Sequence, residues 1–316
     1  MKRRTFLKNI AIGSILANLP LSLVYSKEKL TQNKPIPKRE LANKGDMLSM
    51  IGFGGILLNE NGQEFANETI AKAVDAGVNY FDVAPTYGNA QDLMGPALEP
   101  YRKDCFLACK TGKWDKKEAE EELHGSLKAL KTDHFDLYQL HAISSKEDVD
   151  KALGPNGAIE LFEKAKKEGK IRYIGFSAHS QEAAVYAMDQ YDFDTILFPL
   201  NFVCWYHGNF GPKAYEKAKE KNMGILAIKS MAKNRLEDGE DQLYKNIWYR
   251  PVENTSLSSK ALRFTLSKDI TAAVPPGDSK FLFRAIEHVS QYQALTDEED
   301  SYLQEVARVT NPVFKA

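Results

Sequence analysis

Four titratable side chains of four different types each follow a short apolar run of the sequence. They are Asp82 and Tyr87 in FDVAPTYGN, Lys110 in FLACKTG and His141 in LYQLHA. A tyrosine, whose ordinary pKa is about 10, serves proton transfer well at neutral pH only when a nearby positive charge stabilises its phenolate. A lysine supplies that charge, a carboxylate keeps a buried lysine charged, and a histidine can donate to the same substrate oxygen. The set therefore predicts proton transfer at a carbonyl or hydroxyl oxygen.

The elements that would carry these residues alternate along the chain. Eight short apolar runs are separated by longer segments of helical period, including 67–77, 117–130 and 159–169. The runs are LSMIGFGG, VNYFDVAP, DCFLACKT, FDLYQLHA, IRYIGFSA, TILFPLNF, GILAIKSM and ITAAVPP. Eight strand-then-helix units over roughly 270 residues predict a single α/β domain, a (β/α)8 TIM barrel. An open doubly wound sheet is the competing architecture, but GFGGIL has Leu57 where its phosphate-binding fingerprint needs a glycine.

A barrel would bring the four side chains together. Loops at the carboxyl ends of barrel strands form the active face, and Asp82, Lys110 and His141 end three consecutive predicted strands. Each residue alone has a structural alternative, such as a turn cap, a solvent-facing lysine or a hydrogen-bonded histidine. Because three adjacent junctions converge, we expect one connected proton-transfer set.

Several motifs resemble those of a known family. FDVAPTYGN, CKTG and YQLHA, in this order, are similar to the motifs of the Asp, Tyr, Lys and His tetrad of the aldo-keto reductases, barrels that use NADP(H). LSMIGFGG, IRYIGFSAHS and ALRFTLSKDITAAVPPGDSK extend the resemblance over most of the chain. It implies that Tyr87 is the general acid/base and that Lys110, paired with Asp82, lowers its pKa. It also implies that His141 orients a carbonyl and that a hydride passes between a nicotinamide cofactor and a carbonyl or alcohol substrate.

The resemblance implies cofactor-binding residues as well. They are Ser177, Asn201, Lys229, Gly277, Ser279, Lys280 and Arg284. The match has gaps, because Ala178, Leu197 and Ile228 stand where the family commonly has an asparagine, a glutamine and an aromatic side chain. Lys280 or Arg284 could bind a 2′-phosphate, so we favour NADP(H) over NAD(H).

Two long segments after predicted strands are candidates for substrate binding, at 203–212 and from 232 onward. Their aromatic side chains Trp205, Trp248 and Tyr249 would suit a sugar-like carbonyl compound. Aromatic residues that only pack the loops onto the barrel are the alternative.

Composition excludes several other functions. The 42 Lys and Arg residues balance 43 Asp and Glu residues, giving a formal net charge of −1 that offers nothing to nucleic acid. Three cysteines, Cys105, Cys109 and Cys204, form neither a disulfide framework nor a metal motif. We expect a small-molecule partner and no metal.

The N-terminal sequence predicts export. MKRRTFLKNIAIGSILANLPLSLVYSK has a basic start, an uncharged stretch and a small residue at Ser26, and its consecutive arginines are similar to a twin-arginine signal. We divide the chain into an export signal (1–26), a linker (27–44) and the barrel (45–316). We therefore expect contact with the export machinery, cleavage without a stable membrane anchor, and a periplasmic location. A cofactor could be bound before the folded protein is exported. A retained membrane anchor is the alternative.

Two other functions remain open. A nicotinamide-binding regulatory or sensing protein could use the same barrel. An unrelated hydrolase would need a second carboxylate near Asp82, and no acid stands beside His141.

Overall fold

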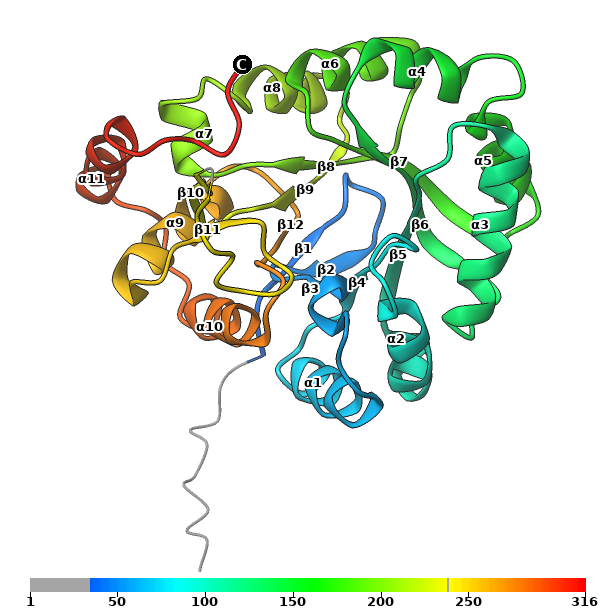
Figure 1. The fold of residues 1–316 in the computed structure, drawn as a ribbon, viewed down its shortest axis with the longest axis horizontal. Helices are drawn as coiled ribbons and strands as arrows, with labels where there is room; N and C mark the ends of the chain where they lie inside the picture. Colours follow the sequence, from blue (N-terminus) through cyan, green and yellow to red (C-terminus); the bar gives the residue numbers. More distant parts are fainter. Residues whose placement is uncertain (1–34, 238) are drawn as a thin grey trace, which may run out of the picture. The chain divides into compact units, whose positions relative to one another are not determined.

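The computed structural model describes residues 35–237 and 239–316, so the predicted export signal lies outside the described residues. Eight parallel strands form one sheet in the order β12-β9-β8-β7-β6-β5-β4-β3 (Figure 1). The strands are β3 (Phe53–Gly54), β4 (Tyr80–Asp82), β5 (Phe106–Thr111), β6 (Phe135–Ile143), β7 (Ile171–Ala178), β8 (Thr195–Pro199), β9 (Gly224–Ile228) and β12 (Ala272–Val274). Seven of them fall within the predicted runs, and β6 extends its run by one residue, to Ile143.

The sheet closes on itself through the residues just before β3. Ile51 forms a parallel bridge with Ala273 of β12. The Ala273 amide donates to Met50 O at 2.9 Å, and the Gly52 amide donates to Ala273 O at 3.0 Å. These bonds join the two edges of the sheet, and the predicted (β/α)8 TIM barrel is confirmed.

Helices surround the strands on the outside (Figure 1). The α-helices are α1 (Gln63–Asp75), α2 (Ala90–Leu98), α3 (Lys116–Ala129), α4 (Lys146–Leu153), α5 (Ala158–Lys167), α6 (Gln181–Gln190), α7 (Phe202–Tyr206), α8 (Pro212–Glu220), α9 (Thr255–Ser267), α10 (Ser279–Ser290) and α11 (Asp297–Arg308). Two 3-10 helices are η1 (Gly55–Leu58) and η2 (Glu99–Asp104). Several helices begin at a capping side chain, as α3 does at Asp115, which accepts from two backbone amides.

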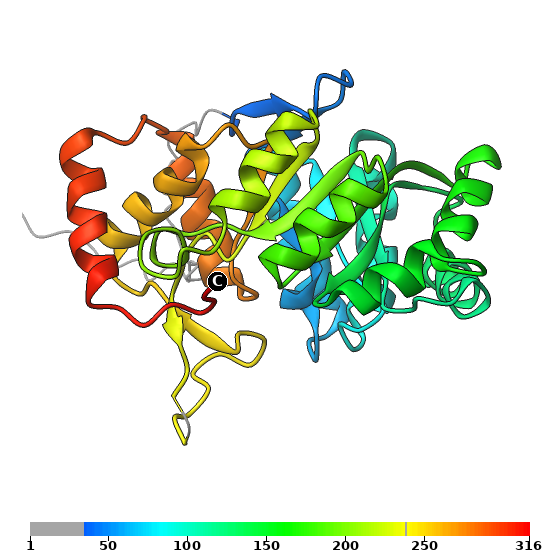
Figure 2. The same ribbon diagram turned by 90° about the horizontal axis from the view of Figure 1, so that it is seen from above.

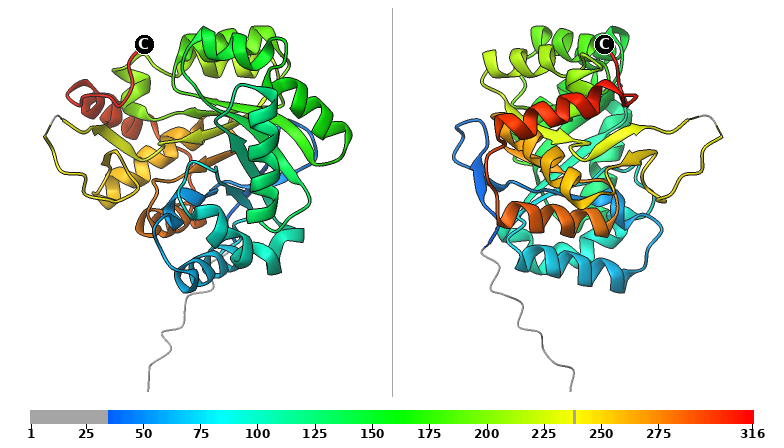
Figure 3. Two further views of the ribbon diagram at one scale, coloured as in Figure 1. Left: turned by 45° about the vertical axis from the view of Figure 1, so that its right-hand side comes forward. Right: turned by 90° about the vertical axis from the view of Figure 1, so that its left-hand side faces the viewer.

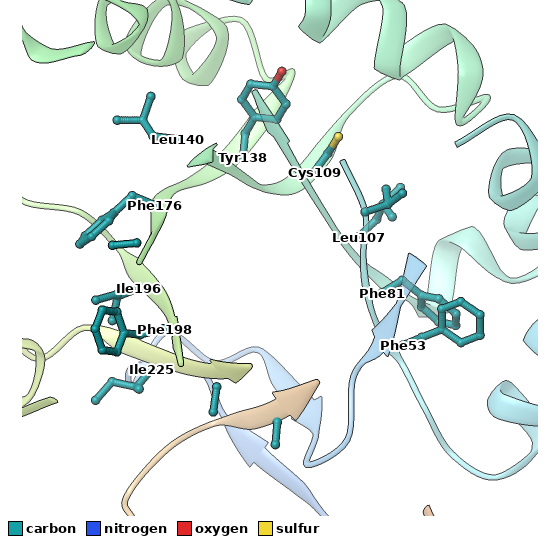
Figure 4. Close-up of a cluster of buried hydrophobic side chains, with 14 of the residues drawn as sticks. Phe53, Phe81, Leu107, Cys109, Tyr138, Leu140, Phe176, Ile196, Phe198 and Ile225 are labelled. Carbon is teal, nitrogen blue, oxygen red and sulfur yellow. The ribbon is translucent and has the colours of Figure 1, made fainter. Parts of the chain in front are cut away.

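Side chains alternate in direction along each strand, so every strand has two faces. Both faces are buried. One set points outward under the helices, as Figure 4 shows for Phe81, Leu107 and Tyr138. The other set points into the barrel and packs as a second cluster that includes Tyr80 and Leu137. Asp82, Lys110, Gln139 and His141 follow this inward register at the carboxyl ends of their strands.

A hairpin closes the other end of the barrel. It consists of β1 (Lys38–Glu40) and β2 (Met47–Ser49), paired antiparallel. Leu41 and Leu48 are fully buried in the interior cluster. Residues 38–44, which we expected to be linker, therefore belong to the packed barrel, because the hairpin inserts apolar side chains into it.

The long segment after β9 forms a second hairpin at the active face. β10 (Ala232–Arg235) pairs antiparallel with β11 (Tyr249–Pro251), and Figures 2 and 3 show this segment projecting away from the barrel. The predicted loop after β8 contains the short helix α7. Within the described residues, no helix has the length and apolar character that a membrane span requires.

Candidate active site

A cavity of about 380 Å³ opens at the carboxyl ends of the strands. The four residues of the predicted proton-transfer set all line it. Its remaining lining residues are Gly54, Ile56, Ser177, His179, Leu197, Ile228, Lys229, Gln242, Lys245, Asn246, Trp248, Tyr249, Val274, Pro275 and Gly277. Side chains separated by tens of residues in the sequence thus meet in one place.

Lys110 and Asp82 form a buried ion pair at the base of the cavity. Lys110 is fully buried, and its Nζ bonds to Asp82 Oδ1 and donates to Val83 O at 3.3 Å. Burial is the largest single influence and lowers the pKa of Lys110, but the charge and hydrogen bond of Asp82, together with the neighbouring Tyr87, outweigh it and the net shift is upward. Lys110 therefore stays positively charged at neutral pH.

Tyr87 lies beside this ion pair. Its ring centroid is 5.3 Å from Lys110 Nζ. Burial raises the pKa of Tyr87 and the positive charge of Lys110 lowers it, with a net upward shift. We expected Lys110 to lower the pKa of Tyr87. Lys110 does act in that direction, but the upward effect of burial on this pKa is larger. Tyr87 accordingly holds its proton at neutral pH, as a proton donor must.

His141 completes the group as a neutral ring. Its centroid lies 5.8 Å from that of Tyr87 in an edge-on arrangement, and its Nδ1 is 3.4 Å from Thr86 Oγ1. Burial first, and then the positive charges of Lys110 and other neighbours, lower the pKa of His141 to about 3. A neutral histidine can donate one hydrogen bond to a substrate oxygen without bringing a competing charge.

Two supporting residues were not predicted. Gln139 Nε2 donates to Asp82 Oδ2 at 3.2 Å, and the hydroxyl of Tyr80 donates to the same oxygen at 3.4 Å. Both side chains point into the barrel, two positions before His141 and Asp82. The signal was present as the alternation of side chains along these strands, which places residues two apart on the same face.

Three of the predicted cofactor residues line the cavity: Ser177, Lys229 and Gly277. Ser177 Oγ accepts a hydrogen bond from the Ala142 amide at 2.8 Å. A Cβ on Gly277 would lie 2.7 Å from Ile56 Cγ2 and 3.0 Å from Asn246 O. Glycine thus lets this turn pack directly against Ile56 and Asn246 at the wall of the cavity.

The other four predicted cofactor residues do not line the cavity. Asn201 is buried and caps α7, with its Oδ1 accepting from the Cys204 amide at 2.9 Å. Lys280 Nζ pairs with Glu253 Oε2 at 2.8 Å, and Arg284 donates to Glu253 O at 2.8 Å. The fourth is Ser279, the first residue of α10.

Of the predicted substrate residues, Trp248 and Tyr249 line the cavity and Trp205 does not. The Trp205 ring packs edge-on against Tyr215 and lies 4.5 Å from Lys268 Nζ. It is one of the aromatic side chains that attach a loop to the barrel. His179, the residue that follows β7, lines the cavity and was missed by the sequence interpretation.

The described residues hold no cluster of three or more His, Cys, Asp and Glu side chains that could bind a metal ion. The three cysteines are free and buried. Burial raises the pKa of the Cys105 thiol to about 12 and that of Cys109 to about 11. These thiols are therefore protonated at neutral pH.

A parallel barrel whose carboxyl-end pocket combines a protonated tyrosine with a buried, charged lysine is suited to an enzyme that transfers a proton at a carbonyl or alcohol oxygen. The sequence model of the Aldo/keto reductase family matches residues 50–277, and the chain belongs to that family. It is a nicotinamide-dependent oxidoreductase acting on carbonyl or alcohol groups. The comparisons give no support to the regulatory alternative.

Individual relatives cover most of the chain. The uncharacterized oxidoreductase YqkF of Bacillus subtilis is 26% identical, over 88% of this chain and 98% of its own length. L-galactose dehydrogenase of Arabidopsis thaliana is 26% identical, over 72% of this chain and 74% of its own length. The solved holo form of an aldo-keto reductase from Bacillus halodurans superimposes with a TM-score of 0.67 at 24% identity, covering 86% of this chain and 96% of its own. This last likeness supports the fold.

Proposed function

We propose that this enzyme interconverts a sugar-like carbonyl compound and its alcohol with NADP(H), with Tyr87 as the general acid/base. The observation that carries the proposal is the place of Tyr87, in the cavity and 5.3 Å from the ammonium of Lys110. When bound, the dinucleotide supplies the hydride for the carbonyl carbon. Side chains of the protein stabilise the negative charge that this transfer creates on the carbonyl oxygen and supply a proton to it.

In the reduction, Tyr87 gives its proton to the carbonyl oxygen and becomes a phenolate. Lys110 stabilises that phenolate, and Asp82 holds Lys110 in place and in its charged form. The neutral ring of His141 donates a hydrogen bond to the same oxygen and so orients the carbonyl. In the oxidation the Tyr87 phenolate takes the proton of the alcohol.

For the cofactor, we propose that Ser177 and the backbone at Gly277 hold the dinucleotide at the wall of the cavity. The preference for NADP(H) rests on two supports. One relative, from Schizosaccharomyces pombe and 30% identical over 52% of this chain, carries NADP(+) in its name. Lys280 and Arg284 follow Gly277 closely, and either could bind a 2′-phosphate after releasing Glu253.

For the substrate, Trp248 and Tyr249 provide aromatic faces at the cavity. Aromatic rings stack on the apolar faces of sugars while nearby polar groups bind the hydroxyls. Two relatives have sugar substrates in their names, L-galactose dehydrogenase and the 6-dehydroglucose reductase of Novosphingobium aromaticivorans, which is 30% identical over 47% of this chain.

The test is the rate of NADPH oxidation with a panel of aldehydes and ketones, for the wild type and for Tyr87→Phe. Loss of the proton donor should lower kcat by about 10²- to 10⁴-fold, while the dissociation constant of NADPH stays unchanged. Full turnover by Tyr87→Phe would contradict the assigned mechanism.

We also propose that residues 1–26 direct export to the periplasm by the twin-arginine route, and that the protein leaves the cytoplasm folded with its cofactor bound. The basic start and consecutive Arg3 and Arg4 support this proposal. Replacing both arginines by lysine should retain the protein in the cytoplasm, as cell fractionation would show. Mass spectrometry of the nucleotide released from denatured periplasmic protein would identify the cofactor, and an empty protein would contradict loading before export.

A further inference from the structure

Lys229 differs from the other lysines that line the cavity. It is only 8% exposed, and within the described part of the chain no carboxylate lies within ion-pair distance of its Nζ. Lys110 is paired with Asp82, and Lys245 is paired with Glu60 at 2.7 Å. A buried ammonium is expensive to keep without an anionic partner. Burial lowers the pKa of Lys229 to about 8, so the side chain still carries its charge at neutral pH. An anion bound in the cavity from outside the chain would stabilise that charge.

The surroundings of Lys229 are rings rather than carboxylates. Its Nζ lies 5.1 Å from the ring centroid of Trp248, 5.7 Å from that of Phe314 and 6.0 Å from that of Tyr249. Aromatic faces hold an ammonium in position without neutralising its charge. The backbone of Lys229 has φ +62°, a left-handed conformation that a side-chain-bearing residue adopts at a cost. The end of β9 is thus bent in a way that keeps this lysine at the cavity.

The position of the ammonium places it on the substrate side. The charge of Lys229 acts on both His141 and His179, and the ring of His179 packs 5.4 Å from Phe314. Gly277 has other neighbours, Ile56 and Asn246. An anion held by Lys229 would therefore lie toward the histidine that orients the carbonyl.

We propose that Lys229 binds a carboxylate of the substrate, so that the substrate is a carbonyl compound that also carries an acid group. The inference rests on the proposed function and replaces our expectation that Lys229 contacts the cofactor. One unpaired lysine next to neutral histidines offers a single positive charge, which matches a carboxylate better than a doubly charged phosphate. Among the described lining residues Asp82 is the only carboxylate, and its charge is already used by Lys110.

The test compares two aldehydes that share a benzaldehyde core, 4-carboxybenzaldehyde and its methyl ester, of which only the first is charged. The wild type should have the lower KM for the acid. Lys229→Met should raise the KM for the acid by about 10- to 100-fold and leave that for the ester unchanged. Lys229→Arg should keep the preference for the acid. Lys245→Met is the matched control, since it removes a paired lysine from the same cavity and should not change the ratio of the two KM values.

Binding measurements separate this inference from the proposed function. Calorimetry of 4-carboxybenzaldehyde with the NADP⁺ complex, which cannot reduce an aldehyde, reports the anion site without turnover. If neither aldehyde is reduced but Lys229→Met weakens acid binding, only the proposed function is contradicted. Equal wild-type affinity for acid and ester would overturn the inference. So would a Lys229→Met protein that loses NADP⁺ affinity with the acid preference intact, because Lys229 would then serve the cofactor. If Lys229→Met does not fold, Lys229→Gln and the wild-type comparison decide.

Discussion

The charges of Lys110 and Asp82 depend on each other, because both side chains are buried below the cavity. We expect Lys110→Met alone to lower the free energy of unfolding by about 3–5 kcal/mol, since it leaves a buried carboxylate without a partner. The double variant Asp82→Asn/Lys110→Met should lose less than the single variant. Urea unfolding of both proteins measures the difference, and a larger loss in the double variant would contradict it.

The pKa of Tyr87 sets the pH dependence of the two reaction directions. Because burial raises this pKa in the free enzyme, Tyr87 is protonated through the neutral range and loses its proton only in alkali. The kcat/KM for reduction should therefore be flat at neutral pH and fall in alkali, whereas that for alcohol oxidation should rise with pH. Since His141 is already neutral, with a pKa of about 3, neither profile should show a step near pH 6.5.

The positions of single site residues were predictable where a titratable residue stands at the end of a predicted strand. Asp82, Lys110 and His141 each close an apolar run, so the sequence alone placed them at one face. Gln139 was missed although the alternation of side chains along β6 places it on the same face as His141. His179 was missed because it lies just beyond the end of β7, where that alternation stops. For Asn201, Lys280 and Arg284, the structure shows partners within the chain that no spacing rule could indicate.

At the scale of elements, the turn between β12 and α10 depends on Gly277. We expect Gly277→Ala to raise the dissociation constant of NADPH by about tenfold or more, because the new Cβ would displace Ile56 or the backbone at Asn246 and narrow the cavity. Gly125→Ala in α3 is the control: a Cβ there meets nothing within 4 Å. It should leave nucleotide binding unchanged and raise the free energy of unfolding by about 0.5–1 kcal/mol. Fluorescence titration measures the binding, and equal affinity in the two variants would contradict the role of Gly277.

The eight barrel strands were predictable because each is an apolar run buried on both faces. The hairpin β1–β2 was not, since Lys38–Glu40 is a polar triplet that pairs only once Leu41 and Leu48 enter the barrel. The hairpin β10–β11 was likewise hidden inside a segment expected to be a loop. Strands that are stabilised by contacts with residues distant in the sequence show little recognisable pattern in their own sequence.

For the whole molecule, two half-buried histidines make the stability of the fold depend on pH. Burial lowers the pKa of both His141 and His179 to about 3, whereas an unfolded histidine titrates at about 6.5. Between these values the unfolded chain binds more protons, so stability is lost as the pH falls, by up to about 1.4 kcal/mol per pH unit for each histidine. His179→Asn should make this decline shallower, whereas replacing the exposed His124 in the same way should not. Urea unfolding at several pH values measures the slope, and identical slopes would refute the linkage.

The closed barrel was predictable from the number of units, but the way it closes was not. The bridge from Ile51 to Ala273 joins residues more than two hundred positions apart, and no local periodicity specifies that pairing.

The burial of the three cysteines offers a way to follow the local opening of this fold. Cys109 and Cys204 are fully covered and Cys105 is 7% exposed, and all three lie in the packed barrel rather than at the cavity. A thiol reagent should modify none of them in the native protein, because it needs both access and a thiolate. Each cysteine then becomes available only when its own strand or loop opens. The rates at which the three thiols react would time the opening of β5 separately from that of the segment after β8, without any introduced label.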